Sequence, residues 1–161
     1  MRYAIVYSSK TGNTRLLAEA LRETLPREDC LYFGPPCDQA LEASVLYVGF
    51  WTDKGTCDQD AGDFLKKLVP GQQVFLFGTA GFGGGEAYFS KILTNVRENI
   101  GEGVTLTGTY MCQGKMPQAV RRRYEAMEDR PRRQAMLDNF DRALHHPDQG
   151  DLDALKQAVH P

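Results

Sequence analysis

Short apolar runs and amphipathic stretches alternate along this chain. The runs are short, rich in β-branched and aromatic residues, and bounded by turn residues, as expected for strands. Five strands are predicted in this way, at 3–7, 31–33, 45–50, 74–77 and 104–111. Apolar residues at helical spacing predict amphipathic helices over about 13–25, 58–67 and 89–96. Between the second and third strands we expect a short helix or none.

This alternation predicts an α/β fold with a doubly wound parallel sheet and helices on both faces. The third and fourth runs are almost continuously apolar, which is typical of strands buried on both faces. In such a sheet, ligands bind at the carboxyl ends of the strands, where the strand order reverses.

The C-terminal third predicts further helices. One begins at Pro117 and is expected to turn Val120, Tyr124 and Met127 inward. We expect a single domain over 1–161, with a core of about 2–128 and a helical extension of about 129–161. The arginines between 121 and 133 are interpreted as a solvated helix face, with a docking patch as the alternative.

A hydroxyl-rich turn separates the first predicted strand from the first helix. The helix's first N–H groups and the positive end of its dipole attract an anion, and Gly12 lets the backbone approach closely. The alternative is an ordinary turn in which Thr11 or Asn13 caps the helix. The turn lacks the glycine-rich nucleotide fingerprints and has one cation, Lys10, which favours a monophosphate. The candidate phosphate cradle comprises Ser9, Lys10, Thr11, Gly12, Asn13 and Thr14.

Two further loops, 51–57 and 78–85, follow the third and fourth strands and are expected to meet the cradle at the same sheet edge. Trp51, the only tryptophan, is suited to stack on a flat ligand; the alternative is packing on a neighbouring helix. Phe82 suits the opposite face of such a ligand or ordinary packing. The glycines around Phe82 allow backbone amides to come close to a ligand.

The composition mainly excludes classes of protein and of site. The 161 residues are 42% hydrophobic and 25% charged, enough for one core. No apolar stretch approaches the roughly 20 residues of a membrane span, and no secretion signal is evident, so we expect a cytoplasmic protein without membrane partners. Four cysteines without a Cys-x-x-Cys pair predict neither a metal site nor disulfides. The net charge of −2 suggests no nucleic-acid surface.

The cradle resembles the phosphate motif of the flavodoxin family, Ser/Thr-x-Thr-Gly-x-Thr, which residues 9–14 match. The resemblance extends over about residues 2–128 and implies the sheet order 2-1-3-4-5. Segments 50–56, 77–79 and 112–115 are similar to loops of a bacterial flavodoxin-like group, some members of which accompany bilirubin reductases.

The resemblance implies noncovalent FMN, with its phosphate in the cradle and its ring between the two further loops. It implies an electron carrier without a substrate of its own, which passes single electrons from a reductase donor to an acceptor enzyme and is a monomer or weak dimer. The alternatives are an NAD(P)H-dependent flavin or quinone reductase, which would be an FMN-dependent oxidoreductase, and a flavin-binding regulatory module.

The cofactor-binding residues that these patterns and the resemblance suggest are Ser9, Lys10, Thr11, Gly12, Asn13, Thr14, Phe50, Trp51, Thr52, Asp53, Lys54, Gly55, Thr79, Ala80, Gly81, Phe82, Gly83, Cys112, Gln113, Gly114 and Lys115. In the family, a glycine carbonyl after the third strand turns toward flavin N5, and Gly55 is the candidate here. Unlike the strongly acidic members of the family, this chain is nearly balanced. Lys54 and Lys115 would favour an anionic reduced flavin, unless they are merely solvated.

Overall fold

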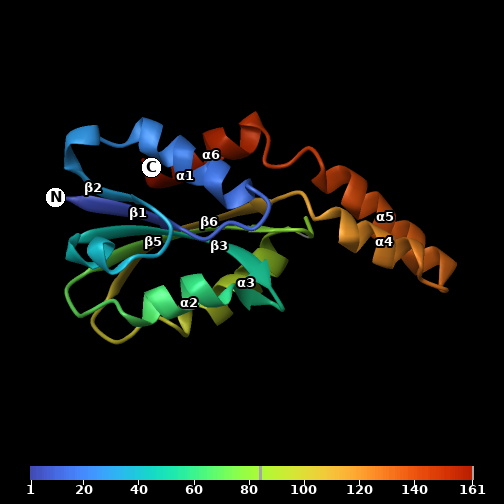
Figure 1. The fold of residues 1–161 in the computed structure, drawn as a ribbon, viewed down its shortest axis with the longest axis horizontal. Helices are drawn as coiled ribbons and strands as arrows, with labels where there is room; N and C mark the ends of the chain where they lie inside the picture. Colours follow the sequence, from blue (N-terminus) through green and yellow to red (C-terminus); the bar gives the residue numbers. More distant parts are fainter. Residues whose placement is uncertain (84, 161) are drawn as a thin grey trace.

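A computed structural model describes residues 1–83 and 85–160, so Gly84 of the third predicted loop and Pro161 lie outside the described residues. Five parallel strands form the sheet, in the order β2-β1-β3-β5-β6 (Figure 1). Their bounds are β1 Tyr3–Tyr7, β2 Cys30–Gly34, β3 Val45–Asp53, β5 Gln73–Ala80 and β6 Thr105–Gln113. Since β4 is only a short addition to β3, this order confirms the predicted 2-1-3-4-5 arrangement.

Helices cover both faces of the sheet, as predicted. Helices α1 (Asn13–Thr24) and α6 (Gln149–Val159) lie together on one face (Figure 1). Helices α2 (Gln59–Lys66) and α3 (Glu86–Arg97) lie on the other. The remaining connections include two short 3-10 turns, η1 (Arg27–Asp29) and η2 (Asp38–Glu42), and β2 joins β3 without an α-helix.

The core has one layer on each side of the sheet. Under α1 and α6, fully buried Leu17, Leu21 and Leu155 pack with strand residues in one cluster. Under α2 and α3, Leu65 and Val96 belong to the other. Each fully buried aliphatic side chain contributes about 1.5–3 kcal/mol relative to exposure, so these layers hold the helices on the sheet.

Two phenylalanine-over-glycine pairs join β3 to β5 where both strands approach their carboxyl ends. Gly49 is paired in register with Phe77, and Phe50 with Gly78. A Cβ at either glycine would overlap the ring of its partner phenylalanine. Glycine is therefore required at both positions, and the close contact fixes the relative height of the two strand ends.

The predicted second loop is partly a hairpin. Strand β3 continues through Trp51, Thr52 and Asp53 and pairs antiparallel with β4 (Thr56–Cys57). Lys54 and Gly55 form the two-residue turn, with φ of 53° and 83°. Positive φ at both central residues matches the twist of paired strands, which is why the chain reverses tightly here.

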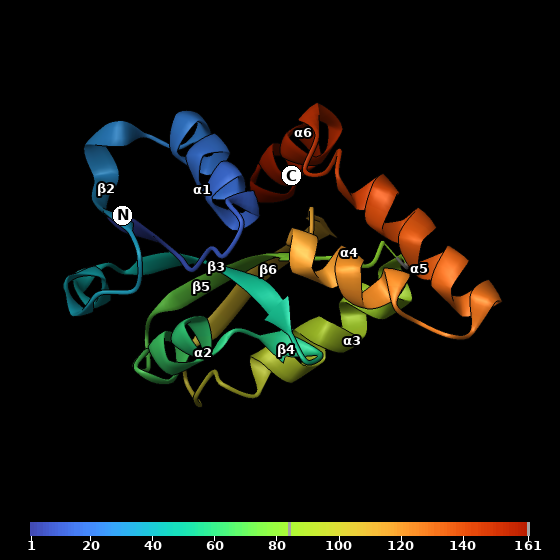
Figure 2. The same cartoon turned by 45° about the vertical axis from the view of Figure 1, so that its right-hand side comes forward.

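Helices α4 (Gln118–Glu125) and α5 (Arg130–Ala143) form a projecting arm, defined here as residues 118–143 (Figure 2). The two helices pack against each other, and α4 has no fully buried residue. We expected this first helix to belong to the core and residues 129–161 to be the extension. Instead α6 covers β6 and α1, because its Leu155 lies in the core. The packing therefore does not follow the expected boundary near residue 128.

Among the described helices, none combines the length and hydropathy required to cross a membrane.

Candidate functional site

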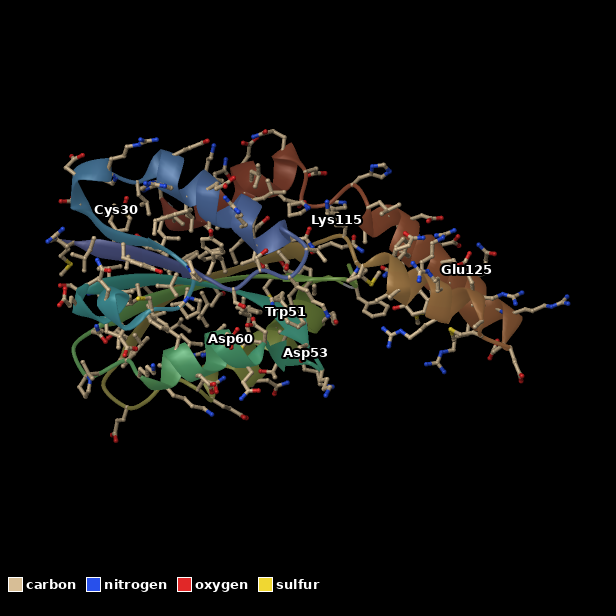
Figure 3. All side chains as sticks on the ribbon, viewed as in Figure 1. Cys30, Trp51, Asp53, Asp60, Lys115 and Glu125 are labelled. Carbon is tan, nitrogen blue, oxygen red and sulfur yellow. The ribbon has the colours of Figure 1, made fainter. Side chains whose placement is uncertain are left out.

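A cavity of about 410 Å³ opens where the predicted loops meet at the carboxyl ends of the strands. Figure 3 marks Trp51 and Asp53 at this end of the sheet, with Lys115 near the base of the arm. Fourteen of the suggested residues line the cavity: Lys10, Thr11, Asn13, Trp51, Thr52, Asp53, Lys54, Gly55, Thr79, Ala80, Gly81, Phe82, Gly114 and Lys115. The structure thus brings the cradle and the strand-end loops together.

The cradle turn leads directly into α1. Gly12 is the N-cap residue, with φ of 90°, a conformation that glycine adopts without strain. Ser9 Oγ accepts hydrogen bonds from the N–H groups of Gly12, at 3.1 Å, and Arg15, at 3.4 Å. Ser9 and Gly12 line a neighbouring hollow with Arg15, rather than the main cavity. Ser9 therefore takes the capping role that we considered for Thr11 or Asn13.

Thr14 holds α1 to the sheet. Its side chain is fully buried, and its hydroxyl donates to the carbonyl of Phe50 at 3.0 Å and lies 3.3 Å from the Thr79 hydroxyl. The expected role of Thr14 as a hydroxyl donor to a phosphate does not fit this geometry. The residue instead fixes the start of α1 against β3 and β5.

Thr11 and Asn13 connect the cradle to the segment after β6. The Lys115 carbonyl accepts from Asn13 Nδ2 at 2.8 Å and from Thr11 Oγ1 at 3.4 Å. The Lys115 N–H donates to the carbonyl of His146, beyond the arm, at 3.0 Å. Asn13 Oδ1 is buried and has no hydrogen-bond partner among the described residues. A buried, unpartnered acceptor at a cavity wall suits a site that is completed by a ligand's donor.

Trp51 lies beside the cradle. In register it pairs with Thr79 of β5, and the Lys10 ammonium lies 5.0 Å from the centre of its ring. This is a cation–π contact, so Lys10 covers the indole in this structure. A flat ligand that stacked on this face would displace the Lys10 side chain.

Asp58, which the sequence patterns did not single out, connects the hairpin to the start of α2. It caps α2 by accepting from the N–H of Ala61 at 3.2 Å, and it also accepts from the N–H of Trp51 at 3.1 Å. Burial raises the pKa of this carboxyl above its ordinary value. The carboxyl therefore fixes the Trp51 backbone relative to α2.

The third loop is held by side-chain amides. The Gly81 carbonyl accepts from Gln113 Nε2 at 2.9 Å and from Asn139 Nδ2, on α5, at 3.0 Å. The ring of Phe82 meets Tyr88 edge-to-face at 6.2 Å. Phe82 therefore lines the cavity while packing on α3.

The turn of the hairpin is tied to α3. Asn95 Nδ2 donates to the Gly55 carbonyl at 2.8 Å. This is the carbonyl that we expected to turn toward a flavin. In this structure, such a turn would exchange the Asn95 hydrogen bond for the new one.

Seven suggested residues do not line the main cavity: Ser9, Gly12, Thr14, Phe50, Gly83, Cys112 and Gln113. Phe50 is fully buried in the core, so only its carbonyl, which holds Thr14, takes part in the site. Cys112 is also buried, and burial raises the pKa of its thiol. Side-chain contact with a cofactor is therefore not supported for Phe50 or Cys112.

One wall of the cavity was not foreseen. It is formed by Tyr88 from α3, by Met116 and Pro117 just before the arm, and by Val120, Arg123 and Tyr124 of α4. The apolar stripe through Val120 and Tyr124 was visible in the sequence, but it was interpreted as facing the core. In the structure it faces the strand-end cavity.

His146, Asp148 and Asp151 have potential ligand atoms within 4.8 Å of one another. The contacts among them are those of a helix cap. Asp151 Oδ2 accepts from the N–H of Asp148 at 2.8 Å and lies 2.6 Å from His146 Nδ1, while Asp148 caps α6 in return.

Two known proteins are similar to this chain over nearly its whole length. The chain is 44% identical to the flavodoxin-like domain-containing protein BilS of Clostridium symbiosum (strain WAL-14163), over 97% of this chain and 93% of that protein. It is 26% identical to the protein of the same name from Clostridioides difficile (strain CD3), over 94% and 90%.

Solved structures show the same fold. A flavodoxin from the Archaea has a TM-score of 0.52 and 16% identity, over 89% of this chain and 99% of that one. Oxidised flavodoxin 2 from Bacillus cereus has a TM-score of 0.51 and 18% identity, over 88% and 99%. The sequence model of the flavodoxin domain matches residues 4–160. With this match over almost its whole length, the chain belongs to the flavodoxin domain family.

Proposed function

We propose that this protein binds FMN noncovalently and carries single electrons between redox partner proteins. The observation that carries the proposal is one cavity that joins the N-terminal turn of α1 to the aromatic and glycine loops after β3 and β5. Its volume of about 410 Å³ lies in the range of cofactor sites, about 300–1,000 Å³. A flavoprotein from Lactobacillus acidophilus NCFM, with a TM-score of 0.50 and 14% identity, has been solved in complex with FMN.

The residues present fit the two ends of this cofactor. The start of α1 offers the positive end of the helix dipole to a phosphate, with Lys10 as the nearby cation. The buried Asn13 Oδ1 lacks a donor, which a hydroxyl of the ribityl chain would supply. Trp51 and Phe82 line the cavity from neighbouring loops and are suited to the flat ring.

FMN, when bound, supplies the electron-transfer chemistry, and the chain's own residues tune and shield it. Thr14 and Asp58 fix the walls through their hydrogen bonds to the Phe50 carbonyl and the Trp51 N–H. The Asn95 hydrogen bond holds the Gly55 carbonyl in the orientation described here. Val120 and Tyr124 reduce the exposure of the cavity to water on the side of the arm.

The test is an absorption spectrum of the purified protein, followed by FMN titration with Trp51 fluorescence as the readout. A ring bound beside Trp51 quenches the only indole of the chain, so we expect saturable quenching and flavin bands that stay with the protein on gel filtration. Trp51→Phe removes the fluorescence and retains an aromatic ring, and its flavin bands serve as the control. Absence of flavin bands from the protein, after FMN has been added and unbound FMN removed by gel filtration, would refute the proposal.

An anaerobic reductive titration then separates a carrier from a reductase. For a carrier, dithionite reduces the bound flavin, whereas NADH and NADPH, added separately, leave it oxidised until a reductase is supplied. Rapid bleaching by either nicotinamide alone would instead assign an FMN-dependent reductase. A bound flavin that cannot be reduced reversibly would favour a regulatory module.

A further inference from the structure

The walls of the cavity carry more positive than negative charge. Lys10, Lys54, Lys115 and Arg123 line it, and Asp53 is the single acidic residue among its described lining residues. All four cations are exposed, whereas Asp53 is partly buried. Because the chain as a whole carries −2, its remaining surface is net negative. Charge is therefore segregated, with the positive part at the cavity mouth.

The four cations come from different parts of the fold and line the same cavity. Lys10 belongs to the cradle, Lys54 to the hairpin turn, Lys115 to the segment after β6, and Arg123 to α4. Figure 3 shows Lys115 near the base of the arm, apart from Asp53 on the hairpin. We call these four residues the basic rim.

The basic rim is not neutralised within the described chain. No carboxylate among the described residues lies within 4.0 Å of its charged groups, although such pairs form elsewhere. On the same helix, Arg121 pairs with Asp141 and lies 4.0 Å from Glu125. Arg121 is thus neutralised within the arm, whereas Arg123 lines the cavity without an acidic partner among the described residues.

We propose that the basic rim docks an acidic face of a redox partner protein over the cofactor edge. This inference rests on the proposed function, since it places the partner where the electron leaves the cavity. Lys10 belongs to the cradle that would hold the phosphate of FMN, so the partner would meet chiefly Lys54, Lys115 and Arg123. Complementary charge at such a mouth raises the association rate by about 10- to 1,000-fold at low salt and selects against basic partners.

The experiment uses two acceptors that share one haem: native cytochrome c, which is basic, and cytochrome c with succinylated lysines, which is acidic. The FMN-loaded protein is photoreduced, and one electron passes from the flavin to haem Fe(III), giving Fe(II). Stopped-flow absorbance follows the reaction at several salt concentrations. Docking at the basic rim predicts that the rate with the acidic acceptor falls as salt screens the charges, and that the rate with the basic acceptor rises.

Charge reversal locates the effect on the molecule. Lys54→Glu with Arg123→Glu is the rim variant. Lys66→Glu with Arg27→Glu is the matched control, because these exposed residues lie in the last turn of α2 and in η1 just before β2, at the amino ends of the strands. At low salt, the rim variant is expected to reduce the acidic acceptor at least tenfold more slowly than wild type and the basic acceptor faster. The control variant is expected to stay within twofold of wild type.

Each outcome has a defined meaning. Flavin content is measured for every protein, and absence of flavin bands in the wild type would overturn both the proposed function and this inference. Flavin bound normally, with equal salt dependence for both acceptors, would overturn only the docking proposal. So would equal effects of the rim and control variants. Should the rim variant lose its fold or its FMN, the wild-type salt dependence with the two acceptors still decides.

Discussion

Replacing Leu155 by alanine tests whether α6 belongs to the core. Leu155 is fully buried in the cluster that includes Leu17 and Leu21 of α1, although the sequence suggested that residues 129–161 were an extension. The substitution removes three side-chain carbons, worth about 2.4 kcal/mol of transfer free energy at about 0.8 kcal/mol each. The cavity left behind adds to this, which gives about 3–4 kcal/mol in total.

Leu144→Ala is the matched control, because Leu144 lies at the end of α5 and is 47% exposed. About half of the transfer free energy is lost there, roughly 1 kcal/mol, and solvent fills the space. In a chain of this size, 1 kcal/mol shifts the melting temperature by about 2–4 °C. We therefore expect a fall of about 6–16 °C for Leu155→Ala and about 2–4 °C for Leu144→Ala.

The assay is thermal unfolding followed by far-UV circular dichroism, with FMN at one fixed concentration because a ligand that binds only the folded state raises its apparent stability. Urea unfolding provides the free energies directly. Equal losses for the two variants would refute the placement of α6 in the core. A larger loss of stability for Leu144→Ala than for Leu155→Ala would also refute it.

Three further outcomes follow from the structure. Burial raises the folded-state pKa of Asp58 above its ordinary value of 3.8, so the folded state binds more protons and is destabilised as the pH rises from about 3.8 to the folded-state pKa. In urea unfolding, the free energy of unfolding of wild type relative to Asp58→Asn should fall by up to about 1.4 kcal/mol per pH unit over this range, and a difference that does not change with pH would contradict this. Cys37 is the exposed thiol among the four cysteines, so its reaction with a disulfide reagent should be the fast phase of thiol modification. The fast phase should be absent in Cys37→Ser, while the buried Cys112 reacts only after unfolding. A Cβ at Gly114 would overlap the Asn13 side chain, so Gly114→Ala should weaken FMN binding at least tenfold in calorimetric titration. Gly101→Ala places its Cβ in open space and should leave the affinity unchanged; equal affinities of the two variants would count against the cradle.

The features that were predictable from the sequence depend on periodicity and on the geometry of parallel sheets. The five apolar runs became the five parallel strands in the expected order. Because parallel strands end at one edge, residues as distant as Lys10, Trp51 and Phe82 could be expected to meet, and they line one cavity. No side-chain detail was needed for either prediction.

Other features were not predictable because one sequence pattern is compatible with several structures. A threonine after a glycine turn suits a phosphate or a backbone carbonyl equally, and Thr14 bonds the carbonyl of Phe50. The apolar stripe of Val120 and Tyr124 indicates a face that is covered, but not what it covers. A Lys-Gly pair carries a weaker hairpin signal than Asn-Gly, so the hairpin of β3 and β4 was missed.

The hairpin turn bears on how this protein could be stabilised. Lys54 has φ of 53°, a left-handed conformation that costs a side chain such as lysine about 1–2 kcal/mol and that glycine adopts freely. Turn geometry alone therefore does not account for a lysine here. Lys54→Gly or Lys54→Asn would relax the backbone and, in the same step, remove a positive charge from the cavity mouth. Backbone stability and surface charge thus place opposite demands on this one position, and a redesign guided by stability alone would remove one of the four positive charges at the cavity mouth.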